Sequence, residues 1–382
     1  MNILIIARGT PSKRDPQWGS FEFDQAKALA SLGHNVIIAS VDTRFRFYWR
    51  KIGLTTKHIN GIHIYNLFVC PGAIVGLLGG YVTDVFNAWV WHKMAKVIAA
   101  NEEKPDVIYS HYLFNTHKAV RYLKDLNAPV VAIEHWSEIN KPVVAPSIQK
   151  MGEDTYPKVD KLLTVSKAAQ KAIKEHFDIE STVVYNMVGE KFIYLPHKNN
   201  DDKVRFIATG SLILRKGFDL LIEAFATLQL PKDKWELHII GAGKQHCELQ
   251  KQIEKHHLTP NIRLVGQQTS EQIIRWLNHS DVFVLPSRME TFGVVYIEAL
   301  ACGLPVIATP CGGPEEFVNE KNGLLVPVDD VKALAAAIRH MYEHHQNYDR
   351  QAIADECQAR FSPEVIAKQL TRIFEEVIKN KQ

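Results

Sequence analysis

Two glutamates eight positions apart, Glu290 and Glu298, are the residues of this chain best placed to do chemistry. Glu290 follows one apolar run and Glu298 lies inside the next, which predicts a buried strand, a loop and a helix. The helix start would present the backbone N–H groups of Thr291, Phe292, Gly293 and Val294. These groups lack intrahelical partners and carry the positive end of the helix dipole, so they favour phosphate or sugar oxygens.

A carboxylate at Glu298 would lie on the same helix face as Val294 and could accept hydrogen bonds from the vicinal hydroxyls of a ribose. The alternative is that Glu290 only complements the helix dipole and that Glu298 is an ordinary surface residue. The apolar flanks of Glu298 predict a helix buried almost all round, where a carboxylate without a partner is costly. This favours a binding role.

Two further segments place polar side chains after predicted strands. Arg215 and Lys216 stand between a strand and an amphipathic helix, so their charges and the helix start would converge on one anion site. The alternative is a pair of solvated basic residues. His135 follows the apolar run 130–133 and is an active-site candidate, although a histidine in such a place is often structural.

The elements that must position these residues form two similar sets. Short apolar runs alternate with helical patterns in each half, which predicts an α/β fold with two Rossmann-like, doubly wound parallel sheets facing each other across a cleft. Such sheets bind ligands beyond the carboxyl ends of their strands. The predicted strands are 3–7, 36–40, 107–109, 130–133 and 162–165 in the first half, and 205–208, 236–240, 263–265, 282–285 and 305–308 in the second.

The polar stretch 198–203 contains no apolar residue and predicts a linker between two domains. We therefore expect an N-terminal domain over 1–197 and a C-terminal domain over 198–361. The tail 362–382 carries an apolar helical stripe and is expected to pack back on the N-terminal domain.

At the glutamate pair the sequence resembles the family 4 retaining glycosyltransferases, also described as glycosyltransferase group 1, which have the two-domain GT-B fold. Their signature is two glutamates with seven residues between them, and the resemblance runs over most of the chain. It is carried by segments whose joint order is specific, namely Gly19, Val165-Ser166, Asn186, Gly210 to Gly217, Gly241-Ala242-Gly243, Glu290 to Glu298 and Gly312-Gly313-Pro314-Glu315-Glu316.

The resemblance implies transfer of a sugar from a nucleoside diphosphate sugar to an acceptor hydroxyl, with retention at the anomeric carbon. Glu298 would bind the ribose, Glu290 with the backbone at Phe292 and Gly293 would hold the donor sugar, and Lys216 would meet the diphosphate. His135 would lie near the reacting carbon. The remaining donor-side positions implied are Gly19, Gly210, Arg215, Gly241, Gly266, Thr291 and Val294. The family often has arginine where this chain has Ser211, and Arg215 is expected to compensate.

Several other classes of function find little support. The formal charge of +3 does not favour nucleic-acid binding, and five scattered cysteines without a C-x-x-C pair favour neither a disulfide framework nor a zinc site. No two aspartates are separated by a single residue, so we expect no metal, and no cofactor besides the sugar nucleotide as co-substrate. The chain begins with a strand pattern and has no apolar run long enough to span a bilayer, which predicts a cytoplasmic protein.

The segment Arg44 to Lys51 alternates basic and aromatic residues and, with the apolar stretch 73–81, could contact a membrane surface or a lipid-linked acceptor at the inner face of the cell membrane. Its aromatic residues could equally fold onto the domain. The role expected is envelope polysaccharide or glycolipid synthesis. Two rival functions stay open, a nucleotide-sugar epimerase of the same fold and a catalytically silent partner that binds a nucleotide sugar.

Overall fold

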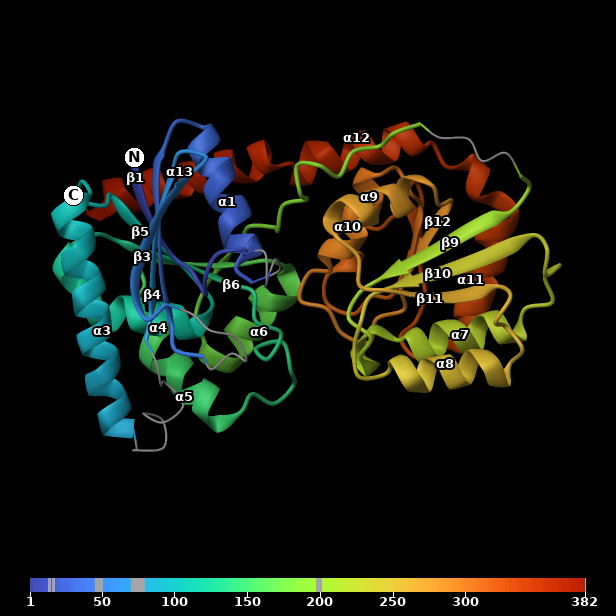
Figure 1. Ribbon diagram of the computed structural model, residues 1–382, viewed down its shortest axis with the longest axis horizontal. Coiled ribbons are helices and arrows are strands. Elements are labelled where there is room, and N and C mark those ends of the chain that lie inside the picture. Colours follow the sequence, from blue (N-terminus) through green and yellow to red (C-terminus); the bar gives the residue numbers. More distant parts are fainter. Residues whose placement is uncertain (13–14, 16–17, 45–50, 70–79, 197–200, 382) are drawn as a thin grey trace. The chain divides into compact units, whose positions relative to one another are not determined.

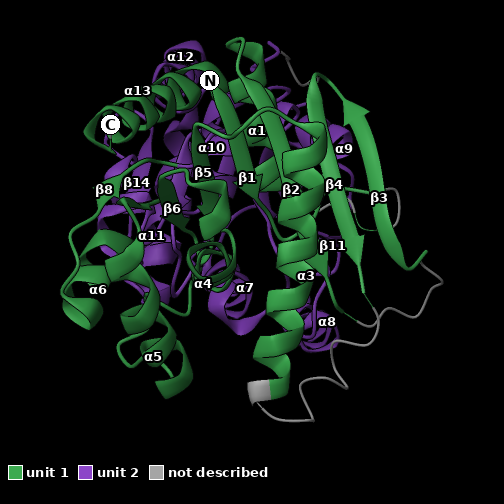
Figure 2. Ribbon diagram, turned by 90° about the vertical axis from the view of Figure 1, so that its left-hand side faces the viewer, with its two compact units in different colours: residues 1–165, 169–185, 363–382 green, residues 166–168, 186–362 purple. Residues whose placement is uncertain are grey.

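The computed structural model describes residues 1–382 except 13–14, 16–17, 45–50, 70–79, 197–200 and 382. The chain divides into two compact units, coloured green and purple in Figure 2. Unit 1 comprises residues 1–165, 169–185 and 363–382, and unit 2 comprises residues 166–168 and 186–362.

Unit 1 is built on an eight-stranded sheet in the order β3-β4-β2-β1-β5-β6-β7-β8. The strands are β1 (Asn2–Ile6), β2 (Asn35–Asp42), β3 (Gly53–Ile59), β4 (Ile62–Phe68), β5 (Val107–His111), β6 (Val130–Glu134), β7 (Lys161–Thr164) and β8 (Thr182–Val183). The helices are α1 (Ser20–Ser31), α3 (Gly80–Asn101), α4 (Leu113–Tyr122), α5 (Pro146–Thr155), α6 (Lys167–Phe177) and α13 (Pro363–Lys381).

The expectation of a wholly parallel sheet is wrong at one edge. Strands β3 and β4 pair antiparallel, whereas the other pairs are parallel. Asn60 and Gly61 form the turn between them, with φ angles of 53° and 76°. Asparagine followed by glycine is the preferred sequence of a two-residue hairpin turn, so the signal was present in the sequence.

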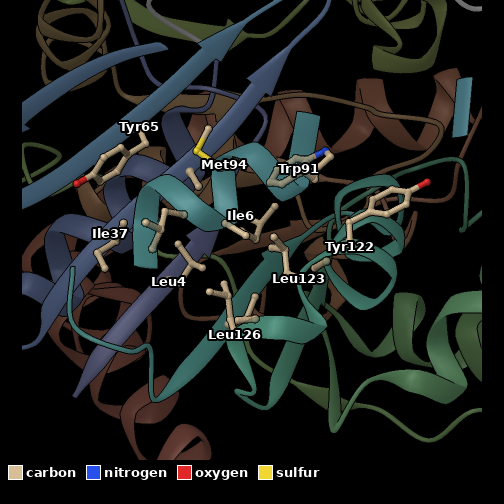
Figure 3. Packing of buried hydrophobic residues seen from close by; sticks show 14 of the residues in the cluster. Leu4, Ile6, Ile37, Tyr65, Trp91, Met94, Tyr122, Leu123 and Leu126 are labelled. Carbon is tan, nitrogen blue, oxygen red and sulfur yellow. The ribbon is translucent and has the colours of Figure 1, made fainter. Parts of the chain in front are cut away.

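The core of unit 1 follows from the alternation of side chains along each strand. Leu4 and Ile6 of β1 and Ile37 of β2 point to one face, where Trp91 and Met94 of α3 pack against them (Figure 3). The alternate residues Ile3 and Ile5 face the other side and are also fully buried. A sheet buried on both faces explains why its strands are continuous apolar runs.

Unit 2 has a six-stranded sheet in the order β11-β10-β9-β12-β13-β14, with all strands parallel. Figure 1 shows α7 and α8 on one side of this sheet and α9 and α10 on the other. The strands are β9 (Val204–Thr209), β10 (Trp235–Ile240), β11 (Ile262–Gly266), β12 (Val282–Val284), β13 (Val306–Ala308) and β14 (Gly323–Leu325). The helices are α7 (Phe218–Thr227), α8 (His246–Lys255), α9 (Ser270–Asn278), α10 (Val294–Ala301), α11 (Val331–His344) and α12 (Arg350–Phe361).

The division between the units differs from the expected boundary at 197/198, because residues from 186 onward belong to unit 2. Val188 N donates to Phe361 O at 2.8 Å, and Leu195 N donates to the side-chain oxygen of Asn278 at 2.7 Å. These bonds tie the segment before the polar stretch to unit 2. The last helix, α13, belongs to unit 1, where the Phe374 ring lies 5.1 Å from that of Tyr109.

Candidate functional site

Glu290 lies in the loop between β12 and α10 and is almost fully buried, with 6% of its surface exposed. Its Oε1 accepts hydrogen bonds from Lys216 Nζ at 2.6 Å and from Ser287 Oγ at 2.7 Å, and its backbone N donates to Cys311 O at 2.9 Å. The loop between β12 and α10 therefore holds a fixed carboxylate against a cation from the β9 loop.

Lys216 is held by a close approach between two loops. It ends the short 3₁₀ turn Leu214–Lys216, and the next residue, Gly217, has φ 69° and caps α7. A Cβ at Gly217 would lie 2.0 Å from Pro286 O, so only glycine fits between the β9 loop and the β12 loop. This contact brings Lys216 to Glu290, although the two residues are 74 positions apart.

Arg288 joins the same two loops and was not among the residues selected from the sequence. Its backbone N donates to Arg215 O at 2.7 Å, and its Nη1 donates to Leu214 O at 2.6 Å. Its guanidinium also binds both carboxylate oxygens of Asp219, at 2.9 and 2.7 Å, and one of Asp329 at 2.6 Å. The hydrogen bonds that Arg288 donates to Asp219 raise the pKa of Arg288; partial burial opposes this shift, and the contact with Asp329 adds to it. In the sequence, only its position two residues before Glu290 indicated that Arg288 could belong to the site.

Arg215 lies beside Lys216 but makes different contacts. Its side chain is half-buried, and its Nε is buried without a hydrogen-bond partner among the described residues. A donor of this kind is costly unless a partner reaches it.

The expected donor-side glycines lie at the carboxyl ends of neighbouring strands. Gly210 N donates to Ile240 O, and Gly241 N donates to Gly266 O, each at 3.0 Å. The ends of β9, β10 and β11 are thus joined by backbone bonds at Gly210, Gly241 and Gly266. The three positions form one edge of the sheet, as the parallel order of the strands requires.

Glu298 is half-buried, so the expectation of a helix buried almost all round is wrong. Val294 and Val295 are half-buried as well, because one side of α10 faces away from the core of unit 2. The carboxylate of Glu298 is therefore accessible on the same face as Val294. The apolar flanks that suggested full burial are the residues of the opposite face, Tyr296, Ile297, Ala299, Leu300 and Ala301.

The start of α10 is closely packed, because Phe292 and Gly293 are buried and Thr291 and Val294 are half-buried. Phe292 is buried, and its ring centre lies 5.3 Å from that of Phe317 and 5.8 Å from that of Phe361. Its side chain therefore belongs to the core. Gly293 caps α10 with φ 92°, and Thr291 is half-buried beside it.

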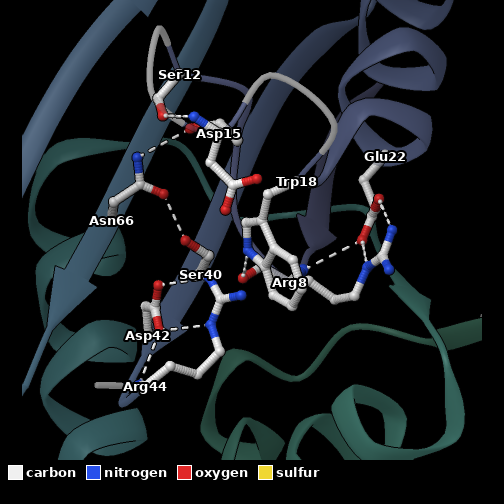
Figure 4. A network of polar contacts seen from close by, with 10 residues as sticks. Arg8, Ser12, Asp15, Trp18, Glu22, Ser40, Asp42, Arg44 and Asn66 are labelled. Carbon is white, nitrogen blue, oxygen red and sulfur yellow. Dashed lines mark hydrogen bonds and ion pairs between the residues drawn. The ribbon is translucent and has the colours of Figure 1, made fainter. Parts of the chain in front are cut away.

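In unit 1, Gly19 caps α1 with φ 73°, and a Cβ there would lie 2.1 Å from Gly9 O. The same region holds the buried ion pair of Arg8 and Glu22, with Nε and Oε1 2.8 Å apart (Figure 4). Burial alone would raise the pKa of Glu22, but the hydrogen bond and charge of Arg8, with the nearby His111, lower it to about 2. Gly19 therefore permits a close turn beside a charged pair.

His135 directly follows β6 and is half-buried. The preceding residue, Glu134, is buried and accepts hydrogen bonds from His135 N at 2.9 Å, Trp136 N at 2.8 Å, Leu113 N at 2.8 Å and Tyr156 OH at 2.9 Å. Burial raises the pKa of Glu134 to about 7, although these four donors oppose the shift. Glu134 thus fixes the backbone that carries His135. Glu134 was not selected from the sequence, where a glutamate at a strand end has no distinguishing pattern.

The remaining expectations concern metals, membranes and the basic aromatic segment. Among the described residues, no group of three or more His, Cys, Asp or Glu side chains could hold a metal ion. None of the helices in the described ranges is long and apolar enough to cross a membrane. Of the segment Arg44 to Lys51, positions 45–50 lie outside the described residues, as do positions 73–79 of the apolar stretch. Arg44 itself pairs with Asp42, their nearest atoms 2.8 Å apart (Figure 4).

Comparison with known proteins identifies the class. Residues 193–356 match the model of the glycosyl transferases group 1, and residues 23–191 match that of glycosyltransferase family 4. The two matches together cover most of both units. The chain belongs to this family of glycosyltransferases and has the GT-B fold of two Rossmann-like domains.

Individual relatives agree with this assignment. The chain is 28% identical over 303 residues to the uncharacterized glycosyltransferase MJ1178 of Methanocaldococcus jannaschii, covering 78% of this chain and 81% of the relative. It is 28% identical over 296 residues to the amylovoran biosynthesis glycosyltransferase AmsK of Erwinia amylovora, covering 73% and 72%. Its fold is similar to that of Anabaena Alr3699/HepE, solved in complex with UDP and glucose, with a TM-score of 0.75, 18% identity and coverage of 98% and 100%.

Proposed function

We propose that this glycosyltransferase moves a hexosyl or N-acetylhexosaminyl unit from a nucleoside diphosphate sugar to an acceptor hydroxyl with retention of configuration. The observation that carries the proposal is the contact of Lys216 with Glu290, 2.6 Å apart at the carboxyl ends of β9 and β12. A cation suits the diphosphate and a carboxylate suits sugar hydroxyls. In this proposal Lys216 binds the diphosphate and Glu290 binds the sugar, one on each side of the bond to be broken.

The reaction balances without a protein nucleophile. The bond from the anomeric carbon to the diphosphate oxygen breaks, and a bond to the acceptor oxygen forms on the same face. The acceptor proton passes to the departing phosphate. Lys216, the buried Nε of Arg215 and the N–H groups at the start of α10 would stabilise the charge that develops on the diphosphate. The half-buried Glu298 would hold the ribose, and His135 would act on the transferred sugar.

A uridine nucleotide is the preferred donor in this proposal. The support is the HepE structure, which contains UDP, and the AmsK relative, whose name places it in amylovoran biosynthesis. We accordingly propose a role in envelope polysaccharide or glycolipid synthesis that needs no metal. The protein's own cations replace the metal that would otherwise neutralise the diphosphate.

The proposal includes contact with an anionic lipid surface. Exposed residues on α3 support it. Val82, Val85 and Trp89 are 40%, 53% and 58% exposed, and their spacing of three and four places them on one helix face. Lys93 and Lys96 continue this face, and Lys93 Nζ lies 5.6 Å from the Trp89 ring centre. Apolar side chains followed by lysines suit the boundary between acyl chains and anionic headgroups.

The test is a panel of UDP and GDP sugars offered to the purified chain. Donors are first ranked by the rise in melting temperature, because a ligand that binds only the folded state stabilises it. The best donor is then incubated with sugar and lipid-linked acceptors, and the anomeric configuration of the first product is read by NMR. An inverted product contradicts retention. Donor conversion without acceptor favours the epimerase, and binding without turnover over a broad acceptor panel favours a silent partner.

A further inference from the structure

Two histidines meet at the carboxyl ends of neighbouring strands in unit 1. His111 is the last residue of β5, and His135 follows β6. Nδ1 of His111 lies 3.1 Å from Nε2 of His135, and the two rings are parallel within 2°. The His111 side chain is fully buried, whereas His135 is half-buried. A buried residue therefore contacts the histidine that we propose to act on the sugar.

His111 is neutral at ordinary pH. Burial lowers the pKa of its imidazole to about 4, with Glu22 raising it and Arg8 lowering it to smaller extents. A neutral imidazole carries one proton, so one nitrogen donates and the other accepts. The two residues can share their hydrogen bond in only two ways, and these differ in what happens at Nε2 of His111.

The surroundings of Nε2 of His111 show which of the two histidines donates the shared hydrogen bond. His111 Nε2 is buried and has no hydrogen-bond partner among the described residues. If His135 donated, His111 would carry its proton on Nε2, and a buried N–H would have no acceptor. If His111 donates from Nδ1, only a lone pair stays unmatched. Orphaned buried N–H groups are rarer in proteins than undersatisfied acceptors, which favours the second arrangement.

We propose that His111 is a positioning residue that donates its Nδ1–H to Nε2 of His135 and thereby keeps the proton of His135 on Nδ1. His135 then presents Nδ1 as a donor and cannot present Nε2 as one. This inference rests on the proposed function, because the tautomer matters for catalysis only if His135 acts on the sugar. It gives a role to a buried histidine that the rest of the reaction leaves unused.

The direct test is nitrogen NMR of histidine-labelled protein, in which protonated and unprotonated ring nitrogens have distinct shifts. Wild-type His135 should show a proton on Nδ1 and an unprotonated Nε2. His111→Leu, which fills the buried space with an apolar side chain that can neither donate nor accept a hydrogen bond, should remove the bias and give a mixture of tautomers. A wild-type His135 protonated on Nε2 would overturn the proposal, as would an unchanged tautomer in the folded His111→Leu variant.

Activity supplies the second readout. His111→Leu should lower kcat about tenfold, the effect of one lost oriented hydrogen bond, while its Kd for UDP stays unchanged because that site lies on unit 2. An asparagine at this position places an amide near the former Nδ1 and can present either N–H or C=O. In His111→Asn, kcat should recover to the extent that NMR finds the Nδ1 proton on His135. Activity that does not follow the tautomer contradicts the proposal.

A matched control is His117→Leu on α4. His117 is also partly buried, and its Nδ1 lies 2.8 Å from Thr155 Oγ1. Its replacement removes a comparable bond and should leave both kcat and the His135 tautomer unchanged. Failure of the proposed function would give a different result. Full activity in His135→Ala, or no transfer by the wild type, would contradict the proposed function without changing the tautomer that NMR measures.

Discussion

Breaking the ion pair of Lys216 and Glu290 should change nucleotide binding in opposite directions, depending on which of the two side chains is replaced. Their side chains are 12% and 7% exposed, so the pair is largely withdrawn from water. Among the described residues, Lys216→Met leaves Glu290 with one side-chain donor, Ser287 Oγ. Glu290→Gln keeps the shape and that bond, but it leaves the lysine without its counter-charge.

The size of each expected change in stability and in UDP affinity follows from the burial of the ion pair. Removing one partner of a buried ion pair costs about 3–5 kcal/mol, and we expect about 3 kcal/mol for Lys216→Met because Ser287 still reaches the carboxylate. The same variant should bind UDP about tenfold or more weakly, since a hydrogen bond to a charged group is worth about 1.5–3 kcal/mol. Glu290→Gln should bind UDP about fivefold more tightly, because Lys216 is no longer neutralised, while transfer falls by about 100-fold.

The measurements are urea unfolding, calorimetric titration with UDP, and transfer rates for both single variants and the double variant. The double variant should show coupling in stability, because each single change removes the same contact. Lys191→Met is the control, since Lys191 and Glu271 form an ion pair that is 71% and 55% exposed, and its loss should leave stability unchanged. Weaker UDP binding by folded Glu290→Gln would refute the view that the two side chains compete for one cation.

Three further results are expected. Glu298→Ala should weaken the binding of UDP, measured by calorimetric titration, by about 1.5–3 kcal/mol. Unchanged affinity would show that Glu298 does not bind the ribose. The pKa of Glu22 is about 2 in the folded protein against an ordinary value of 4.5, so its ionised form stabilises the fold by up to about 3 kcal/mol. This stabilisation is present above pH 4.5 and is lost as pH falls toward 2. Glu22→Gln should therefore reduce the fall in unfolding free energy over this acid range. Replacing Lys93 and Lys96 by glutamine should reduce sedimentation with anionic vesicles, and equal binding by parent and variant would exclude α3 as the contact surface.

The sequence predicted the strands well because parallel strands buried on both faces are continuous apolar runs. The run at 130–133 and the strand β6, for example, differ by one residue. The hairpin of β3 and β4 was missed because β3 is partly exposed and carries polar residues, so no apolar run marks it. Only the Asn60-Gly61 turn pointed to it.

A site residue could be predicted where the short sequence segment around it is enough to indicate its position in the fold. Glu290 and Lys216 each lie in the loop that follows a predicted strand, so the shared edge of a parallel sheet brings them together. Arg288 could not be found in this way, because its partners, Asp219 and Asp329, are 69 and 41 residues away. The burial of His111 and its contact with His135 depend on packing between strands, which periodicity does not encode.

Two buried glutamates, Glu134 at the end of β6 and Glu290 in the loop after β12, show why residue type and position alone did not separate a substrate-binding carboxylate from a structural one. Glu134 is held by three backbone N–H groups and a tyrosine hydroxyl, which are fixed parts of the fold and leave its carboxylate no partner to exchange. Glu290 is held by the flexible side chain of Lys216 and by one serine hydroxyl. A lysine can turn toward a phosphate, and the carboxylate that it leaves can then accept a sugar hydroxyl. The mobility of the partner, rather than the burial of the carboxylate, makes Glu290 the residue suited to a substrate.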